Sequence, residues 1–192
     1  MSYEIELKAH VYDKKNTTEI LNKNCTYLGK TEKSDTYYTF NNNNKSCRIR
    51  KETSVNGSSS SSKTSIIFTY KRKEQKQNSD GTIIEVNDEN ECEISDEKAL
   101  EVFFEDCGAK ISLKKQKSVE HWNFTKGNYT AHIELCNVPP LGDFLEIEVI
   151  NDSNSNKAVD EAKQLILSIF EMCGIPQSAI ENRYYKDMLK NL

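Results

Sequence analysis

Tyr3-Glu4-Ile5-Glu6-Leu7-Lys8 opens the chain and alternates between apolar and charged residues. Strict alternation is typical of a half-buried β-strand, because successive side chains of a strand point to opposite faces. The two glutamates and Lys8 therefore share one face. Two carboxylates on one face repel each other unless a cation lies between them, and a hard divalent cation prefers carboxylate oxygens. The stretch predicts either an ordinary sheet strand with its charged face in water, or a metal site beside an ammonium group that suits a polyphosphate.

The same spacing of like charges recurs along the chain, and each pair is two residues apart on one strand face. These pairs are Arg48 and Arg50, Lys71 and Lys73, Glu91 and Glu93, Lys115 and Lys117, and Glu146 and Glu148. Outward charges would give an ordinary small barrel, whereas inward charges would give a polar tunnel. We favour the tunnel, because amphipathic helices need an apolar sheet face outside it. Buried charges without partners are costly, so the tunnel predicts a polyphosphate and metal ions inside.

Periodicity and turn residues predict about eight strands and three or four helices. The strands are expected near 3–8, 34–40, 47–50, 66–73, 82–94, 111–124, 129–136 and 144–149, and the helices near 16–24, 95–107, 156–172 and 178–189. Strands follow one another through turns, which favours an antiparallel sheet. The expected fold is α+β: a closed eight-stranded antiparallel β-barrel with helices packed outside. The serine-rich segment 55–65 is expected to be a flexible surface loop.

Composition narrows the functional classes. A length of 192 residues is consistent with a single domain over residues 1–192. The formal net charge of −4 provides no general positive potential that would attract nucleic acid. No apolar run approaches the roughly 20 residues of a membrane span, and no signal-peptide pattern follows Met1, so we expect a cytoplasmic protein without a membrane partner. The six cysteines are scattered without a CxxC pair, as in a reduced protein, and argue against a cysteine zinc site. A homodimer is left open.

Six segments in order resemble motifs of the CYTH domain family, the triphosphate tunnel metalloenzymes. Glu4-x-Glu6-x-Lys8 resembles the hallmark E-x-E-x-K, and residues 141–148 resemble the specific signature L-G-x-F-x-E-I-E. The remaining four resemble D-x-Y-F, R-x-R, T-x-K and the closing Y-x-x-L-L, and they are Asp35-x-Tyr37-Tyr38, Arg48-Ile49-Arg50, Thr69-Tyr70-Lys71, and Tyr185 with Leu189. The resemblance covers nearly the whole chain, and it implies a single CYTH domain over 1–192.

This resemblance implies a triphosphate in the middle of the tunnel with one or two Mg²⁺ or Mn²⁺ ions. By position in the motifs, the metal ligands would be Glu4, Glu6, Glu146 and Glu148. The phosphate ligands would be Lys8, Arg48, Arg50, Lys71 and Lys73, among which Lys8, Arg50 and Lys71 would be catalytic. Arginine pairs bidentately with phosphate and lysine acts as a point charge, so these residue types fit phosphoryl or nucleotidyl transfer.

Two positions depart from the family pattern. The family's K-x-R before an aromatic residue would place its lysine at Lys117 and its arginine at Val119, unless the register shifts and Lys115 and Lys117 form the pair. An aspartate of the family falls at Cys136, and Glu134, two residues earlier on the same strand face, is the expected substitute as a metal ligand. Lys115 and Lys117 are accordingly predicted to bind phosphate.

The first strand continues as Lys-Ala-His, which is more similar to the class IV adenylyl cyclase branch than to thiamine triphosphatase. The first hypothesis is therefore a metal-dependent enzyme that converts ATP to cyclic AMP and pyrophosphate. Its alternative is a triphosphatase that hydrolyses thiamine triphosphate or tripolyphosphate. A hypothesis of another class, favoured by Val119 and Cys136, is a polyphosphate- or nucleotide-binding module without turnover.

Overall fold

The computed structural model describes residues 3–40, 46–55, 62–77, 83–152 and 155–190, and gives the backbone alone at 55, 71–77, 83–89 and 190. Strands dominate these residues and are β1 (Tyr3–His10), β2 (Thr26–Phe40), β3 (Ser46–Val55), β4 (Ser62–Gln77), β5 (Ile83–Ile94), β6 (Ala109–Lys126), β7 (Tyr129–Val138) and β8 (Gly142–Asn151). All of their pairings are antiparallel. The predicted α+β fold with an eight-stranded antiparallel sheet is confirmed.

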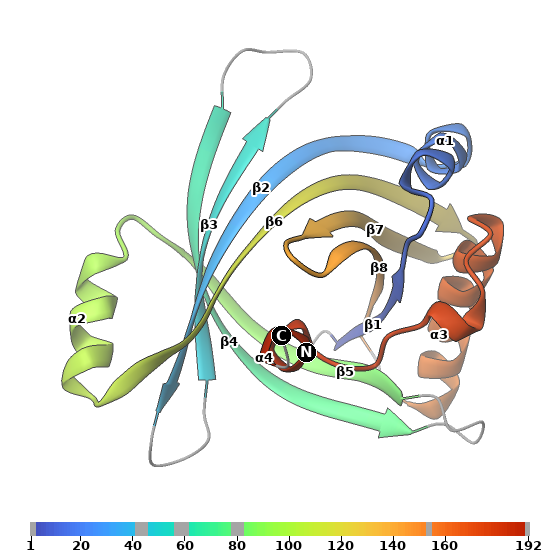
Figure 1. Ribbon diagram of the computed structural model, residues 1–192. Coiled ribbons are helices and arrows are strands. Elements are labelled where there is room, and N and C mark those ends of the chain that lie inside the picture. The colour runs from blue at the N-terminus through green and yellow to red at the C-terminus, as the bar shows by residue number, and fades with distance from the viewer. Residues whose placement is uncertain (1–2, 41–45, 56–61, 78–82, 153–154, 191–192) are drawn as a thin grey trace.

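The strands follow the order β1-β5-β4-β3-β2-β6-β7-β8, and β1 also pairs with β8. Figure 1 shows them curving around a central space. The β1–β8 ladder runs along the whole of β1, whereas the β1–β5 ladder involves Glu4, Ile5 and Glu6. The return of the sheet to its first strand therefore depends on this short β1–β5 seam.

Apolar side chains of β1, β7 and β8 face outward and form the main core with α3 (Asn156–Met172). Ile5, Ile133 and Ile147 are fully buried there against Ile166 and Ile169 of the helix. Ser155 caps α3 by accepting a hydrogen bond from a backbone N–H of its first turn. The charged residues that alternate with these apolar residues line the interior, in agreement with the tunnel interpretation.

Two further helices cover other parts of the outer face. α1 (Lys14–Asn24) buries Leu21, and its Asn22 accepts a hydrogen bond from the indole N–H of Trp122. α2 (Lys98–Asp106) buries Phe104 in a separate cluster with Tyr38 and other side chains of β2, β3 and β4. In Figure 1, α1 and α3 lie on one side of the barrel and α2 on the opposite side. Helices α1, α2 and α3 thus pack outside the sheet, as predicted.

The expected boundaries were wrong at three of the four predicted helices. The predicted helix 178–189 is broken into a 3₁₀ turn, Gln177–Ala179, and α4 (Tyr185–Lys190). Ile180 instead forms a bridge with Ala9, and the N–H of Glu181 donates to the carbonyl of Lys8, because β1 extends past β5 and its backbone groups need partners. Helix α1 begins before Asn16, with Asp13 as its cap. Helix α2 begins at Lys98, after the predicted start at residue 95, and the N–H of Lys98 donates to the Asp96 side chain.

The serine-rich loop predicted over 55–65 is too long. Val55 ends β3 and pairs with Ser62, and residues 62–65 belong to β4. Thr53 and Thr64 exchange a hydrogen bond between their hydroxyls, at 3.0 Å, so cross-strand pairing outweighs the low strand propensity of serine. Residues 56–61 lie outside the described residues.

Among the residues described, no helix combines the length and apolar character needed to cross a membrane.

Candidate functional site

A cavity of about 330 Å³ lies inside the barrel. Apart from Ile67, Tyr184 and Tyr185, its lining is charged or imidazole, whereas ordinary small-molecule pockets are mainly apolar. The lining side chains of this kind are Glu4, Glu6, Lys8, Lys33, Arg48, Arg50, Glu52, Glu91, Lys115, Lys117, His132, Glu134, Glu146 and Glu148. This lining suits a small ligand of high charge.

Five of the seven lining carboxylates lie on three neighbouring strands, β1, β8 and β7, whereas Glu52 and Glu91 lie on β3 and β5. Glu6 pairs across strands with Glu148, and Glu134 pairs with Glu146. Side chains directly opposite each other on adjacent strands lie about 4.5–5.5 Å apart at Cβ, and like charges there are destabilising. This acidic wall therefore needs cations, either from the rest of the barrel or from a ligand.

Cationic side chains gather on β2, β3 and β6, where the cavity is lined by Lys33, Arg48, Arg50, Lys115 and Lys117. Lys8 lies apart from them on β1, opposite Glu146. The cavity thus has an acidic wall and a basic wall, which is the arrangement that a metal-bound polyanion requires.

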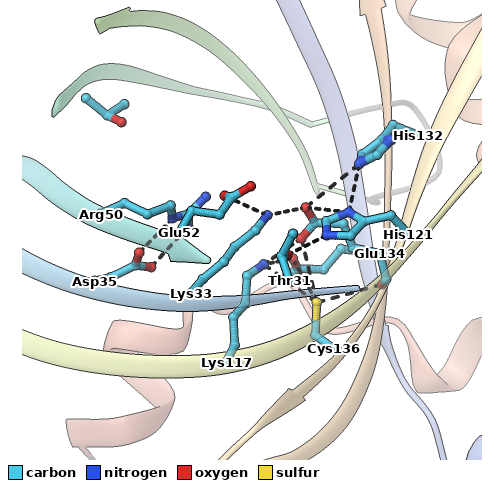
Figure 2. Close-up of polar contacts among 12 residues, drawn as sticks. Thr31, Lys33, Asp35, Arg50, Glu52, Lys117, His121, His132, Glu134 and Cys136 are labelled. Atoms are coloured by element: carbon cyan, nitrogen blue, oxygen red, sulfur yellow. Dashed lines mark hydrogen bonds and ion pairs between the residues drawn. The ribbon is translucent and has the colours of Figure 1, made fainter. Parts of the chain in front are cut away.

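Asp35 holds one of these arginines in place. Its carboxylate accepts hydrogen bonds from Arg50 Nε at 2.7 Å and Arg50 Nη2 at 3.0 Å (Figure 2). Lys115 Nζ lies 3.3 Å from the same carboxylate. Burial alone would raise the pKa of Asp35, but the charge and hydrogen bonds of Arg50 outweigh burial and lower this pKa well below its ordinary value. The ionised carboxylate therefore fixes the guanidinium plane from one side.

The ammonium group of Lys117 lies between two carboxylates. Its Nζ donates to Glu134 Oε2 and to Glu146 Oε2, both at 2.7 Å, and lies 3.6 Å from Cys136 Sγ. Burial would raise the pKa of Glu146, but the charge of Lys117 outweighs it and lowers the pKa to about 2. Burial raises the pKa of Cys136 well above its usual range, so the thiol stays neutral. Cys136 thus does not supply the negative charge of the aspartate that the family pattern expects, whereas Glu134 is ionised.

The lining of the cavity favours the shifted register on β6. Lys115 and Lys117 both line it, whereas Val119 is fully buried in an apolar cluster with Cys136 and Phe144. Tyr185 and Met188 of α4 complete this cluster, and α4 lies within the ring of strands in Figure 1. Lys115 and Lys117 are therefore the β6 cations that face the cavity, and Val119 packs in the same apolar cluster as Tyr185 and Met188.

Most of the predicted site residues come together in this one cavity. Glu4, Glu6, Glu146, Glu148 and Glu134 line it together with the predicted cations Lys8, Arg48, Arg50, Lys115 and Lys117. Their roles as metal and phosphate ligands stay predictions. Lys71 and Lys73 belong to β4, but their side chains lie outside the described part of the chain.

Sequence reasoning missed Lys33 and Glu52. Lys33 Nζ lies 2.5 Å from Glu134 Oε1 and 3.7 Å from Glu52 Oε2 (Figure 2). Its strand was expected to begin at residue 34, so the shared parity of Thr31, Lys33 and Asp35 on β2 was not used. Residues 31–35 are polar throughout, so the sequence shows no apolar alternation that would mark this part of β2.

Two histidines also lie beside Glu134 and were not predicted. His121 Nδ1 is 3.2 Å from His132 Nε2 and 3.6 Å from Glu134 Oε1. Burial lowers the pKa of His121 to about 4 and also lowers that of His132, so both imidazoles are neutral at pH 7. Because the partners belong to different strands, β6 and β7, linear spacing gave no signal for this cluster.

Solved structures similar to this chain share its fold. A protein from Pyrococcus horikoshii gives a TM-score of 0.74 at 24% identity, with 98% of each chain covered. A candidate adenylate cyclase from Vibrio parahaemolyticus gives a TM-score of 0.71 at 15% identity, also with 98% of each chain covered. A candidate adenylyl cyclase from Hippeastrum is described as having a dominant triphosphatase activity. It gives a TM-score of 0.63 at 12% identity, and the alignment covers 100% of this chain and 96% of the Hippeastrum chain.

A comparison with curated protein sequences found no match. The sequence profile of the CYTH domain, however, matches residues 2–185. This match spans nearly the whole chain and agrees with the barrel and with the paired charges along its strands. The chain therefore belongs to the CYTH domain family.

Proposed function

We propose that this protein is a divalent-metal-dependent enzyme that processes a triphosphate inside the barrel. The observation that carries the proposal is one cavity that combines an acidic wall on β1, β8 and β7 with a basic wall on β2, β3 and β6. CYTH proteins are commonly enzymes that require a metal. The strand order brings residues that are far apart in sequence to one site, which supports a shared role.

Glu4, Glu6, Glu146 and Glu148, with Glu134 at the edge of the group, would hold Mg²⁺ or Mn²⁺. The fit is chemical: these residues offer the hard carboxylate oxygens that both ions prefer, and Glu6 and Glu148 are direct cross-strand neighbours. When bound, the ion would neutralise negative charge on the phosphate oxygens.

The cations of this chain would bind and orient the phosphates. Arg50, fixed by Asp35, would present a rigid pair of donors, and Arg48 would contribute a second guanidinium. Arg48 Nη2 already donates to Thr69 at 2.9 Å and to Glu91 at 3.0 Å, and these partners orient it. Lys8, Lys115 and Lys117 would act as point charges. Lys8, Arg50 and Lys71 stay the predicted catalytic cations.

The preferred reaction is cyclisation of ATP, on the basis of the sequence of the first strand. The ribose 3′-oxygen would form a bond to the α-phosphorus, the bond from this phosphorus to the bridging oxygen would break, and pyrophosphate would leave. The hydroxyl proton would pass to water or to a carboxylate. The triphosphatase alternative is favoured by one observation: besides charged and imidazole groups, the cavity is lined by Ile67, Tyr184 and Tyr185, which offers little apolar surface to an adenine.

The deciding experiment incubates the purified protein with ATP, thiamine triphosphate or tripolyphosphate, each with Mg²⁺ or Mn²⁺. Cyclic AMP with pyrophosphate identifies a cyclase, and orthophosphate identifies a triphosphatase. Binding without either product identifies the non-catalytic module and refutes the enzyme. Glu6→Gln is expected to reduce turnover by orders of magnitude, whereas Glu32→Gln, on an exposed position of β2, is the matched control and should leave it unchanged.

A further inference from the structure

Three potential metal ligands converge at the β6–β7 ladder. They are His121 Nδ1, His132 Nε2 and Glu134 Oε1, which lie within 4.8 Å of one another. The separations are 3.2 Å between the two nitrogens, 3.6 Å from His121 to Glu134 and 3.9 Å from His132 to Glu134 (Figure 2). The two histidines have no part in the function proposed above.

These separations match the dimensions of a small metal site. Ligand atoms at 2.0–2.1 Å from a tetrahedral ion are about 3.3–3.4 Å apart, by the tetrahedral angle. The three observed separations bracket this value, and shifts of a few tenths of an ångström would equalise them. The histidines and Glu134 are held on paired strands, so their backbone is already in place.

The outer nitrogen of each imidazole has an oxygen partner. His132 Nδ1 lies 3.1 Å from Asn123 Oδ1, and His121 Nε2 lies 2.6 Å from Thr31 Oγ1. In the tautomers that donate from these outer nitrogens, His132 Nε2 and His121 Nδ1 both present lone pairs to the centre of the cluster. Histidines that bind metals are usually held in this way, by an oxygen that accepts from the other ring nitrogen.

We propose that His121, His132 and Glu134 bind a borderline transition-metal ion, with Zn²⁺ or Co²⁺ as the best fits. Two imidazoles and one carboxylate suit such ions better than Mg²⁺, which prefers oxygen ligands. A second group, Glu134, Cys136 and Glu146, is also compact, but Lys117 Nζ already lies among these three side chains. The site opens to the cavity, because His132 and Glu134 line it.

Lys33 tunes this site. Its ammonium contacts the same oxygen, Glu134 Oε1, that the metal would use, so the ion and Lys33 compete for it. Glu52, 3.7 Å from Lys33 Nζ, offers the lysine another partner when the ion binds. Replacement of Lys33 by methionine removes the competing charge and should therefore increase the affinity for the metal. If the histidines had only a structural role, this replacement would not change metal affinity.

The test uses the full chain without any triphosphate, so its outcome is separate from the outcome of the turnover assay. Co²⁺ is titrated and followed by its visible absorption, and Zn²⁺ affinity is measured by competition with a chromophoric chelator. We expect one equivalent of Co²⁺ with imidazole ligation. His121→Gln and His132→Gln should each abolish the absorption, and Thr31→Val should weaken Zn²⁺ binding about tenfold.

His10 is the remaining histidine of the chain and gives the matched control, because it lies beside Glu181 away from this cluster. His10→Gln should bind Co²⁺ as the unaltered protein does. Should the two ligand variants fail to fold, Thr31→Val and Lys33→Met still decide the matter, since they must shift affinity in opposite directions. Absence of Co²⁺ and Zn²⁺ binding to the unaltered protein, or equal binding by all of these variants, would overturn the proposal.

Discussion

Replacement of Asp35 by asparagine tests how the barrel supports its interior cations. The Asp35 side chain is fully buried and makes two hydrogen bonds to Arg50, at 2.7 and 3.0 Å, with Lys115 Nζ at 3.3 Å. Asparagine keeps the shape and one acceptor oxygen, but it removes the charge and turns an amide donor toward a guanidinium that only donates. Two buried cations then lose their shared anion.

Loss of one partner of a buried ion pair typically costs about 3–5 kcal/mol, because the remaining charge stays buried without compensation. Arg50 and Lys115 both line the cavity and can gain some hydration there, so we expect the lower part of this range, about 3 kcal/mol. For a chain of this size, each kcal/mol lowers Tm by roughly 2–4 °C, which gives a decrease of about 6–12 °C.

The pH dependence gives a second readout. The pKa of Asp35 in the folded protein is lowered from its ordinary value of 3.8, so the unfolded chain binds the proton more readily. The stabilisation is therefore fully present above pH 3.8 and is lost as pH falls below it toward the folded pKa. The difference in unfolding free energy between the unaltered protein and Asp35→Asn should accordingly narrow below about pH 4.

Urea unfolding at pH 7 and at low pH measures both effects. Glu19→Gln is the control, because Glu19 belongs to an exposed pair with Lys15 and its replacement should change stability by less than about 0.5 kcal/mol. Tripolyphosphate should recover part of the stability of Asp35→Asn, since its oxygens replace the missing anion beside Arg50. Equal stability of Asp35→Asn and the unaltered protein at pH 7 would refute the assignment of Asp35 as the anchor of these cations.

Three further substitutions probe the helices and the acidic wall. Ser155→Ala removes the cap of α3 and should cost about 1 kcal/mol, seen as a Tm lower by roughly 2–4 °C; an unchanged Tm would contradict the role of the cap. Phe104→Ala should cost about 3–5 kcal/mol in urea unfolding, whereas Phe103→Ala, 58% exposed on the same helix, should change little; similar costs would show that α2 is not anchored by Phe104. Glu6→Gln without metal should unfold at the same temperature or higher, because it relieves carboxylate repulsion, and a clear decrease would argue against the acidic wall.

Much of the fold followed from local pattern. Alternation on β1 and β8 put Ile5 and Ile147 on one face and Glu6 and Glu148 on the other, because a strand has a period of two. The amphipathic helices then indicated that the apolar face lies outside. The helix over 156–172 was predicted in the same way, because its apolar residues recur every three to four positions and so lie on one face of a helix. Local pattern did not predict the break at Ile180, since this residue is held by a bridge to Ala9 at the other end of the chain.

The candidate site was predicted where the two members of a pair lie on one strand, and was missed where they lie on different strands. Arg48 and Arg50, or Lys115 and Lys117, share a face by spacing alone. The meeting of Lys33 with Glu134, and of His121 with His132, depends on which strands become neighbours and in which register. That information resides in the assembled sheet, where long-range packing chooses the pairing.

Glu134 shows why the assembled interior matters for function. One of its oxygens accepts from Lys33, the other accepts from Lys117, and His121 and His132 lie beside the first. A hard ion bound through Glu146 would withdraw that carboxylate from Lys117 and make Lys117 more dependent on Glu134. An ion at the histidines would in turn draw Glu134 away from both lysines and strengthen their attraction for phosphate. Because coupling between binding sites is reciprocal, the two proposed metal sites and the polyanion would not fill independently, and Glu134 would carry the coupling between them.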